Sequence, residues 1–362
     1  MPRIELPISK SIANRLLILQ ATHGDGLMTV SCDMPDDVRI MSEAIRLLGE
    51  RREARIDLGN CGTSMRFLTA YCAQLEGQTI ILDGVERMHL RPIGQLVNAL
   101  REIGADIEYL GEEGFPPLRI KGCTLDKRRI VTINNPQSTQ FVSALLLIGT
   151  NVQTDSTSPY IYITQEVIKQ YQLSPFSFHL SVEKDWSSAA FWYEYVALYG
   201  GEITLLGLSR DSLQGDKIVA DIFAHLGIHT TYTAEGITLS PIAYSEASYS
   251  PLSGRPIAAQ AASHSKILVQ DFGNCPDLYP AVALTCERLG IELHATGVES
   301  LPLKESDRLR AVAEHRADAD HRMAMALLIA GYEVDDTTCI SKSYPQFLEH
   351  FHQLQENNCL HS

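Results

Sequence analysis

The chain has 362 residues, of which 45% are hydrophobic and 20% are charged. This composition is that of a globular protein with room for two domains, and no apolar run approaches the roughly 18 to 20 residues of a membrane-spanning helix. The formal net charge of −14 disfavours nucleic acids and anionic membranes as partners, because both are polyanions. An acidic chain that gathers its cations in a few motifs is expected to use them on a small anion.

The cysteines and the N-terminus indicate a cytoplasmic protein. The eight cysteines include no C-x-x-C pair and no Cys/His spacing typical of zinc sites, and the histidines form no H-E-x-x-H motif. The opening residues, Met-Pro-Arg-Ile-Glu, lack the basic and apolar regions of a secretory signal. We therefore expect buried thiols, no metal, no cofactor and a cytoplasmic location.

Residues 4–8 predict a short strand, which leads into a helix that begins at Ser11 and has an apolar face from Ile12. Lys10 lies at the mouth of this helix, and Ser11 and Arg15 share one face because they are four residues apart. Helix amides, a hydroxyl, an ammonium and a guanidinium together suit an oxyanion or phosphate. The alternative is a capped helix with incidental basic residues.

One pattern recurs along the chain: an amphipathic helix closed by glycine and followed by an alternating strand. It predicts helices over residues 38–49, 92–104, 216–227 and 278–290. The closing glycines are separated by about one or two units of some 60 residues. This spacing predicts repeated α/β modules rather than one doubly wound sheet. A solenoid is disfavoured, because the units are long and degenerate.

Polar connections lead into further helices. The turn G-N-C-G-T around Gly62 has glycines and amides that suit an anion, although such turns are common. Arg91 directly precedes a helix started by proline. Residues 134–140 enter a helix through serine, threonine and glutamine, and residues 158–160 precede another.

The densest charge run, L-P-L-K-E-S-D-R-L-R-A-V-A-E over residues 301–314, predicts a helix mouth. If Leu309, Val312 and Ala313 face a core, Glu305 and Arg308 lie on a neighbouring stripe. A carboxyl beside ammonium and guanidinium groups can bind an anion and move a proton. The alternative is a solvated first turn with weak intrahelical ion pairs.

The carboxyls Asp277 and Glu305 both lie near helix starts, although an N-cap is the usual role of an Asp there. Together with nearby cations they predict a cleft that binds at least two anionic groups and transfers protons. Phosphate-loop and dinucleotide glycine motifs are absent, which disfavours ATP and NAD. A metal-independent transferase acting on phosphorylated or carboxylated small molecules fits best. Seven of the 30 basic residues lie at loop-to-helix junctions: Lys10, Arg15, Arg91, Lys304, Arg308, Arg322 and Lys342.

Seven motifs in order give the chain a specific resemblance: L-P-x-S-K-S-x-x-N-R, G-N-x-G-T-x-M-R, R-M-x-x-R-P-I-G, S-x-Q-F-x-S-A-L-L, P-D-x-x-P, K-E-S-D-R and D-H-R-M-A-M. From about residue 4 to about residue 350 the chain resembles the 5-enolpyruvylshikimate-3-phosphate (EPSP) synthase family. The K-S pair after the first strand disfavours the runner-up, UDP-N-acetylglucosamine enolpyruvyl transferase, whose K-N and cysteine-loop signature is missing. A non-catalytic relative that keeps the anion sites is a second alternative.

The resemblance implies an α/β (α+β) fold of two domains, each with three βαβαββ-type units, helices inside and sheets outside, as in an inside-out α/β barrel. Crossings near Ile8–Ser9 and Lys184–Asp185 would place residues 9–184 in one domain and residues 1–8 plus 185–362 in the other. It also implies transfer of the enolpyruvyl group of phosphoenolpyruvate to the 5-hydroxyl of shikimate 3-phosphate, through a tetrahedral intermediate, in aromatic amino-acid biosynthesis. The implied partners are these two small molecules, without nucleic acid or membrane, and the protein is expected to be a monomer.

The resemblance further implies residue roles. Asp277 takes the proton of the attacking hydroxyl, Glu305 protonates the methylene carbon, and Lys10 contacts both substrates. The implied ligands of shikimate 3-phosphate are Lys10, Ser11, Arg15, Ser138, Thr139, Gln140, Thr157, Tyr160, Asp277, Ser300 and Lys304. Those of phosphoenolpyruvate are Lys10, Asn60, Gly62, Arg91, Gln140, Arg308, Arg322 and Lys342. Supporting residues are Thr63, Arg66, Asp185 and His321.

Three residues depart from the family pattern. The family's S-[RK]-P-Y is T-S-P-Y here, which moves the phosphate-contacting hydroxyl to Thr157 and removes the basic neighbour. Ser300 stands where asparagine is common, and Cys61 stands where a small alanine is usual. The larger Cys61 is expected to crowd the phosphoenolpyruvate pocket.

The chain also departs in length. Only five residues separate Glu314 from Asp320, where the family has a strand-containing segment. The chain is short near residues 171–175 as well, and the family's first strand is missing before Met1. Either residues are omitted or the protein is shortened. Omission is favoured, because a deletion is expected to pull apart strand pairings beside intact motifs.

Overall fold

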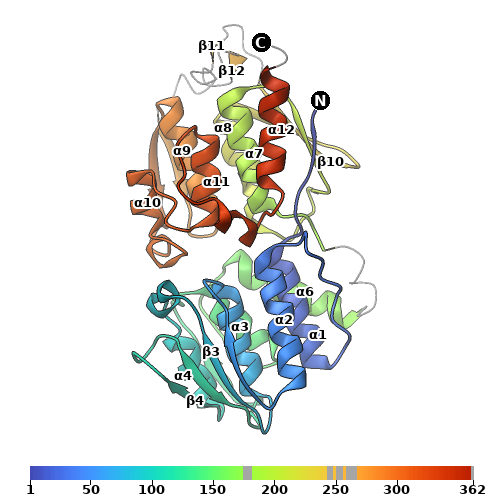
Figure 1. Cartoon of the computed structure of the whole chain (residues 1–362), viewed down its shortest axis with the longest axis vertical. Helices are drawn as coiled ribbons and strands as arrows, with labels where there is room; N and C mark the ends of the chain where they lie inside the picture. The colour runs from blue at the N-terminus through green and yellow to red at the C-terminus, as the bar shows by residue number, and fades with distance from the viewer. Residues whose placement is uncertain (174–181, 243–247, 250–255, 258–266, 360–362) are drawn as a thin grey trace. The chain divides into compact units, whose positions relative to one another are not determined.

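The computed structural model describes residues 1–173, 182–242, 248–249, 256–257 and 267–359. The chain divides into two compact units (Figure 1). Unit 1 comprises Met1–Ser9, Asp33–Pro35 and Glu183–Ser362, and unit 2 comprises Lys10–Cys32 and Asp36–Val182. Among the described residues, no helix is both long enough and apolar enough to span a membrane.

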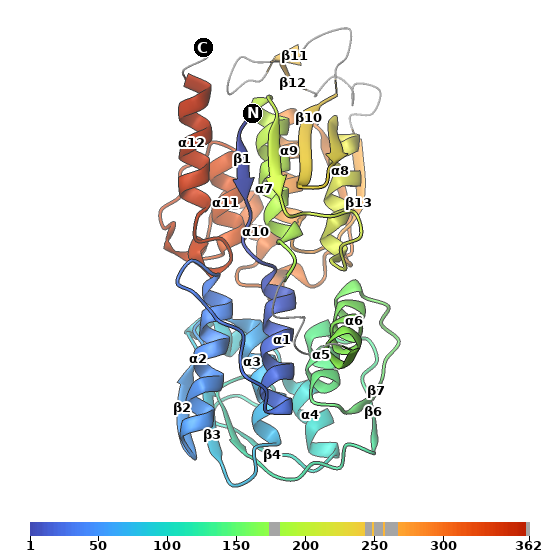
Figure 2. The same ribbon diagram turned by 90° about the vertical axis from the view of Figure 1, so that its right-hand side faces the viewer.

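Unit 2 packs helices inside and strands outside, as Figure 2 shows for β2 and β3 beside α2 and α3. Its helices are α1 (Lys10–His23), α2 (Asp36–Glu50), α3 (Gly62–Ala73), α4 (Gly94–Glu102), α5 (Thr139–Leu147) and α6 (Pro159–Leu173), with a 3-10 helix, η1, at Glu86–Leu90. One sheet has the order β2-β3-β5-β4, from β2 (Glu53–Asp57), β3 (Thr79–Asp83), β4 (Asp106–Tyr109) and β5 (Leu118–Lys121). A second is the parallel pair β6 (Ile130–Thr132) and β7 (Asn151–Gln153).

Unit 1 follows the same plan. Its helices are α7 (Trp186–Tyr199), α8 (Val219–His225), α9 (Tyr279–Leu289), α10 (Arg308–Glu314), α11 (His321–Ile329) and α12 (Phe347–Cys359), with 3-10 helices η3 (Gly215–Ile218), η5 (Leu301–Leu303) and η6 (Thr338–Lys342). One sheet has the order β1-β8-β10-β9, from β1 (Arg3–Glu5), β8 (Ile203–Leu206), β9 (Ile228–Tyr232) and β10 (Gly236–Pro241). The pairs β11 (Ser248–Tyr249) with β12 (Pro256–Ile257), and β13 (Ile267–Asp271) with β14 (Glu292–Thr296), complete the described strands.

The two four-stranded sheets are built alike, which confirms repeated α/β modules. Each starts with a parallel pair, β2 with β3 or β1 with β8, and adds two antiparallel strands. In β6–β7 and β13–β14 the described residues form the parallel pair alone. Within the described residues, the modules therefore share a plan but differ in how many strands complete it.

Glycine ends three of the four predicted helices. Gly104, Gly227 and Gly290 follow α4, α8 and α9 with φ of 103°, 83° and 68°, a backbone region that favours glycine. Gly49 was expected to close α2, but the helix continues through it to Glu50. A helix interior tolerates glycine at a modest cost, so glycine alone does not end a helix.

Two further boundaries differ from prediction. The strand expected over residues 4–8 is shorter, because β1 ends at Glu5 and Ile8 makes only a single bridge to Lys184. The helix expected from Ser11 begins at Lys10.

The short connection from α10 to α11 is closed by its own hydrogen bonds. The Arg316 amide donates to the Ala311 carbonyl at 2.9 Å, and the Asp320 amide donates to the Ala317 carbonyl at 2.9 Å. Strands β13 and β14 keep full register over five residues each. Among the described residues, this pair lacks the two antiparallel strands that complete the four-stranded sheets, and the omission of residues from the short connection stays a prediction. The other short stretch lies near residues 171–175. Helix α6 ends at Leu173, and residues 174 and 175 lie outside the described residues.

The core of unit 1 surrounds α7 and contains both tryptophans of the chain, Trp186 and Trp192. Trp192 packs on Phe347 with ring centroids 5.5 Å apart and donates a hydrogen bond to the Tyr344 hydroxyl. Glu194 lies in the same helix, fully buried, and neither carboxyl oxygen has a hydrogen-bond partner in the structure. Burial raises the pKa of Glu194 well above its ordinary value, so the side chain is buried as a neutral acid.

We expect Glu194→Gln to stabilise unit 1 increasingly as pH rises. The unfolded chain ionises Glu194 above about pH 4.5 while the folded chain keeps it neutral, so wild-type stability falls with pH from there upward. Glu194→Gln removes this pH-dependent loss of stability. The free energy of unfolding of the variant should therefore exceed that of the wild type by up to about 1–3 kcal/mol. Tryptophan fluorescence during urea unfolding, at about pH 4 and about pH 8, measures it, because both tryptophans lie in unit 1. The exposed Glu349→Gln on α12 is the matched control, and an advantage that does not change with pH would contradict the prediction.

Candidate active site

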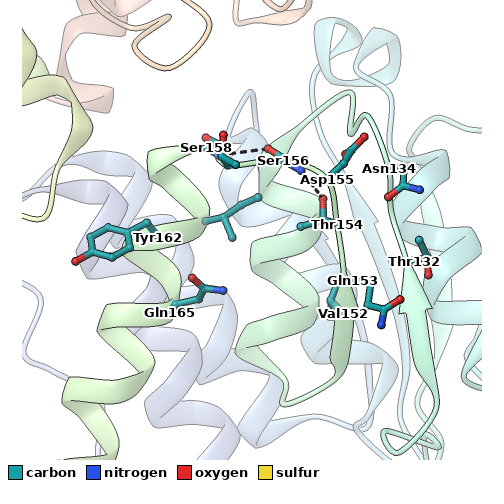
Figure 3. Close-up of a pocket in the computed structure, with 12 residues that line it drawn as sticks. Thr132, Asn134, Val152, Gln153, Thr154, Asp155, Ser156, Ser158, Tyr162 and Gln165 are labelled. Atoms are coloured by element: carbon teal, nitrogen blue, oxygen red, sulfur yellow. Dashed lines mark hydrogen bonds between the residues drawn. The ribbon is translucent and has the colours of Figure 1, made fainter.

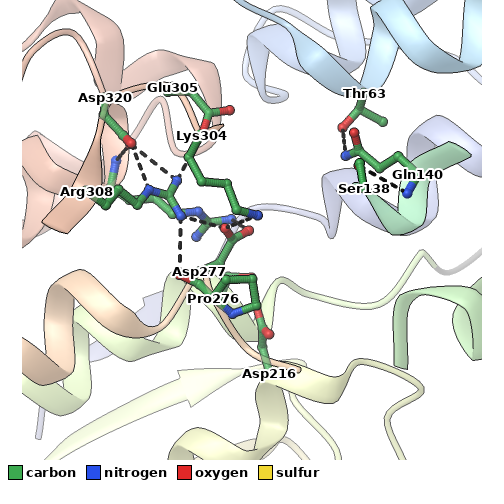
Figure 4. Close-up of polar contacts among 12 residues, drawn as sticks. Thr63, Ser138, Gln140, Asp216, Pro276, Asp277, Lys304, Glu305, Arg308 and Asp320 are labelled. Carbon is green, nitrogen blue, oxygen red and sulfur yellow. Dashed lines mark hydrogen bonds and ion pairs between the residues drawn. The ribbon is translucent and has the colours of Figure 1, made fainter. Parts of the chain in front are cut away.

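Arg308 is the centre of a charged cluster in unit 1 (Figure 4). Its side chain is 1% exposed, and it makes ion pairs with Asp277 at 2.7 Å, Glu305 at 3.1 Å and Asp320 at 2.8 Å. Burial lowers the pKa of Arg308, but these carboxylates raise it more, so the pKa lies above its ordinary value. The alternative of a solvated first turn is therefore wrong.

Asp277 is held by three cations. Arg322 Nη2 lies 2.9 Å from Asp277 Oδ2, Arg308 contacts Oδ1, and Lys304 Nζ lies 3.6 Å from Oδ1. Burial raises the pKa of Asp277, but Arg322, Lys304 and Arg308 outweigh it and hold the pKa well below its usual range. The N-cap of α9 is Leu278, so Asp277 does not cap the helix and the N-cap alternative is wrong.

Glu305 lies between two cations, with Arg308 on Oε2 and Lys342 Nζ 3.0 Å from Oε1. It precedes α10, whose N-cap is Asp307, so Glu305 and Arg308 meet across a helix start rather than along a helical stripe. The buried residue of α10 on its apolar side is Ala311, whereas Ala313, predicted to face the core, is exposed. Leu309 and Val312 pack partly buried against the core, as predicted.

Two carboxylates of this cluster had no predicted role. Asp320 is fully buried, caps α11 by accepting from the Arg322 amide at 2.9 Å, and accepts from Ser306 Oγ. Asp216, in η3, accepts a hydrogen bond from Ser187. Burial, with the charge of Asp277 as the next cause, raises the pKa of Asp216 to about 6. Asp320 begins the sequence D-H-R and Asp216 ends the sequence Q-G-D, but neither short sequence shows that its aspartate is buried.

Unit 2 contains a second polar cluster around Arg15. The side chain is buried, and its guanidinium donates to Thr164 Oγ1 at 2.7 Å, the Ser11 carbonyl at 2.7 Å and the Tyr160 carbonyl at 3.1 Å. Burial lowers the pKa of Arg15 to about 10. Arg15 thus links α1 to α6 and brings Ser11 and Tyr160 together. At the start of α1, Lys10 pairs with Asp37 at 2.9 Å.

A third cluster lies at the start of α3. The guanidinium groups of Arg66 and Arg91 approach Gly62 so closely that a Cβ there would lie 2.4 Å from a nitrogen of each. Arg91 also donates to the carbonyl and the side-chain oxygen of Asn60, at 3.0 and 3.2 Å. Gln140 accepts from Arg66 at 3.2 Å and donates to Thr63. Two like charges beside a helix N-terminus form a cradle for an anion.

The other predicted residues lie in separate places. Ser138 caps α5, with Thr139 as the first residue of that helix. Thr157 lines a cavity of about 760 Å³ in unit 2, whose labelled residues in Figure 3 carry mainly hydroxyl and amide groups. Ser300 is the N-cap of η5. Asp185 caps α7, and His321 is buried at the start of α11.

The structure thus brings six predicted residues of unit 1 together: Asp277, Lys304, Glu305, Arg308, Arg322 and Lys342. In the part of the chain that the structure describes, His, Cys, Asp and Glu side chains do not gather in threes as a metal site requires.

Known proteins resemble the chain over nearly its whole length. The family model described as EPSP synthase (3-phosphoshikimate 1-carboxyvinyltransferase) matches residues 50–174, 147–316 and 313–351. A 3-phosphoshikimate 1-carboxyvinyltransferase from Bacteroides fragilis is 36% identical over 406 residues, covering 95% of this chain and 93% of the relative. One from Cellvibrio japonicus is 30% identical, covering 97% and 96%. A solved EPSP synthase from Acinetobacter baumannii has a TM-score of 0.62 at 19% identity, covering 97% of this chain and 95% of that chain, which confirms the predicted fold class.

We expect Asp320→Asn to destabilise unit 1 by about 3 kcal/mol, because it leaves the buried Arg308 without one of its counter-charges. Asparagine is itself a good N-cap, so the capping bond of α11 does not explain the loss. The matched control is Asp307→Asn at the N-cap of α10, where a change under about 0.5 kcal/mol is expected. Urea unfolding followed by tryptophan fluorescence compares the two, and equal effects would argue against a special role for Asp320.

Proposed function

Because the chain belongs to the EPSP synthase family, we propose that it transfers the enolpyruvyl group of phosphoenolpyruvate to the 5-hydroxyl of shikimate 3-phosphate and releases phosphate. This places it among the transferases of the shikimate pathway, which supplies aromatic amino acids. The observation that carries the proposal is the ion cluster of Asp277, Glu305 and Arg308, where two carboxyls meet cations in a buried setting.

Each half of the reaction, the addition and the elimination, needs two proton transfers that this cluster can supply. In the addition, Asp277 takes the proton of the 5-hydroxyl while Glu305 gives a proton to the methylene carbon, so the oxygen bonds to the central carbon of phosphoenolpyruvate. In the elimination, the methyl group returns a proton to Glu305, the bond between carbon and the phosphate oxygen breaks, and Asp277 gives its proton to the leaving phosphate. The products are the enol ether and inorganic phosphate. An ionised Asp277 fits the role of base, because Arg322, Lys304 and Arg308 lower its pKa against the effect of burial.

The cations fit the anionic parts of both substrates. We assign phosphoenolpyruvate to the residues that the resemblance implies for it: Lys10, Asn60, Gly62, Arg91, Gln140, Arg308, Arg322 and Lys342. Charge-assisted hydrogen bonds to phosphate and carboxylate are the strong ones and favour phosphate as a leaving group. Lys10 contacts both substrates in this proposal. We assign shikimate 3-phosphate to Ser11, Arg15, Ser138, Thr139, Gln140, Thr157, Tyr160, Asp277, Ser300 and Lys304.

The remaining proposals concern the whole chain. We propose that the two units are the two domains, with crossings near Ile8–Ser9 and Lys184–Asp185; unit boundaries at Ser9 and Glu183 support this. We also propose a monomer, supported by ion pairs such as Arg119–Glu108 on the outer face of a sheet, where charge opposes edge and face association. A cytoplasmic location is supported by seven of the eight cysteines, which are thiols rather than disulfides.

Phosphate release tests the function directly. The protein should release phosphate only when phosphoenolpyruvate and shikimate 3-phosphate are both present. Turnover with UDP-N-acetylglucosamine instead would establish the runner-up activity. Calorimetric binding of shikimate 3-phosphate without any turnover would establish the non-catalytic relative.

We expect Glu305→Gln to lower kcat by roughly 10²- to 10⁴-fold, the usual contribution of a positioned acid or base. Glutamine has the same shape but cannot donate a proton to carbon, so shikimate 3-phosphate binding measured by calorimetry should change little. Phosphate release under substrate saturation measures kcat. Activity near the wild-type value would remove Glu305 from the acid role.

We expect Gly62→Ala to raise the KM for phosphoenolpyruvate, because the added methyl group would lie 2.4 Å from both Arg66 and Arg91 and displace the cradle. A rise on the order of tenfold corresponds to about 1.4 kcal/mol of lost binding. Gly49→Ala is the matched control, since a Cβ at Gly49 meets nothing within 4 Å. An unchanged KM in Gly62→Ala would show that phosphoenolpyruvate does not use this cradle.

A further inference from the structure

Four side chains of unit 1, here called the clasp, join the ends of the helices that carry the charged cluster: Glu287, Arg288, His315 and Tyr332. His315 Nε2 lies 2.9 and 3.0 Å from the two carboxylate oxygens of Glu287. The His315 ring stacks on Tyr332, with centroids 4.0 Å apart and 18° between planes. Tyr332 donates to Glu287, and the Arg288 guanidinium lies 4.0 Å from the centroid of the Tyr332 ring.

The clasp connects three elements. Glu287 and Arg288 belong to α9, which begins just after Asp277. His315 is the C-cap of α10, which begins at Arg308. Tyr332 follows α11, which carries Arg322 near its start, and Arg288 Nε donates to the Ala330 carbonyl at 2.6 Å. Each of these three helices therefore has Asp277, Arg308 or Arg322 at or just before its N-terminal end. Each also has a clasp residue near or beyond its C-terminal end.

The connection that follows His315 is strained. Among the described residues, four residues other than glycine have a positive φ: Asn135, His315 (52°), Asp318 (47°) and Ala319 (56°). Three of them lie in the six residues, 315–320, that join α10 to α11, and such conformations persist only where the surroundings hold them. Ala319 is a poor residue for this region, since alanine lacks the local hydrogen bonds that favour Asn and Asp there. The clasp supplies contacts that hold the first of these residues.

The clasp lies away from the reacting groups. Helix α10 has seven residues, so His315 is roughly 10 Å from Arg308 along the helix. The side chains of His315 and Glu287 are 35% and 39% exposed, unlike the buried Arg308 and Asp320. A residue so placed acts on substrate binding only through the helices that it connects.

We propose that His315 is a positioning residue: its pairing with Glu287 and Tyr332 fixes α10 against α9 and α11, and so sets the distances from Arg308 and Arg322 to Asp277. This inference rests on the proposed function and adds to it a determinant of phosphoenolpyruvate affinity. The two arginines are the residues assigned to phosphoenolpyruvate, so a looser clasp weakens that substrate first. Shikimate 3-phosphate depends on Lys304 and Ser300, which precede α10, and its affinity should change less.

The test uses His315→Asn and Glu287→Gln. Asparagine tolerates the left-handed backbone at this position, so the variant removes the ring and the ion pair without adding backbone strain. The control is His294→Asn on β14, which breaks another exposed histidine–glutamate pair, His294 with Glu292 at 2.7 Å. For each protein, KM for each substrate and kcat come from phosphate release, and the unfolding midpoint comes from tryptophan fluorescence.

We expect His315→Asn to raise KM for phosphoenolpyruvate about fivefold, in the range found for coupled contacts, with a smaller effect on kcat. Glu287→Gln should raise it similarly, and the double variant should be no worse than either one, because both remove the same pairing. The His294→Asn control should match wild type. If His315→Asn fails to fold, Glu287→Gln and Tyr332→Phe still test the proposal.

The inference is overturned if KM for phosphoenolpyruvate is unchanged in folded His315→Asn, or if only kcat and the unfolding midpoint fall, as a merely structural role predicts. Additive effects in the double variant would also overturn it, because independent residues add. A wild-type protein that releases no phosphate would instead refute the proposed function, and the two failures are thereby distinguished.

Discussion

The burial of Arg308 is the constraint on which unit 1 depends. A guanidinium that is 1% exposed is tolerated only with counter-charges in good geometry, because removing a charge from water costs several kcal/mol. Those counter-charges come from the start of α9, the turn before α10 and the N-cap of α11. The three helices therefore have to converge on one side chain, so folding this core also assembles the groups proposed to do the chemistry.

Unit 2 also contains a buried guanidinium, but its partners are uncharged oxygen atoms rather than carboxylates. Arg15 is buried among hydroxyl and carbonyl oxygens, and its bond to Thr164 spans 149 residues of sequence. Arg66 and Arg91 lie together over Gly62, where the absence of a side chain leaves room for both. The energy that holds two like charges together comes from fixed acceptors such as Asn60 and Gln140, which orient the guanidinium groups before any anion arrives.

Local patterns in the sequence predicted the modules, because the helical period and the glycine that follows a helix both act over a few residues. Gly104, Gly227 and Gly290 end helices as predicted, whereas α2 continues through Gly49. The motifs predicted Asp277, Glu305 and Arg308, since the resemblance fixes residue types at fixed spacings. The roles of Asp320 and Asp216 were not predicted, because burial depends on tertiary packing. His315 and Glu287 are 28 residues apart, with no periodic signal to join them. The short Glu314–Asp320 spacing is evident in the sequence, but the tight turn that it forms depends on backbone conformations that composition does not reveal.

Exposure divides the carboxylates around Arg308 into two kinds. Asp320 is 0% exposed and also caps a helix, so an incoming anion cannot replace it without disrupting α11. Asp277 and Glu305 are 19% and 11% exposed, and each can give up its cations to a phosphate or carboxylate. Loss of its cations would raise the pKa of Asp277, because the arginines and lysine that depress it would then face the ligand. In the proposed mechanism, substrate binding would thus strengthen Asp277 as the base at the moment that it is needed, while Asp320 keeps Arg308 in place. The same pairs that make the ligand-free cluster stable therefore prepare it for the reaction.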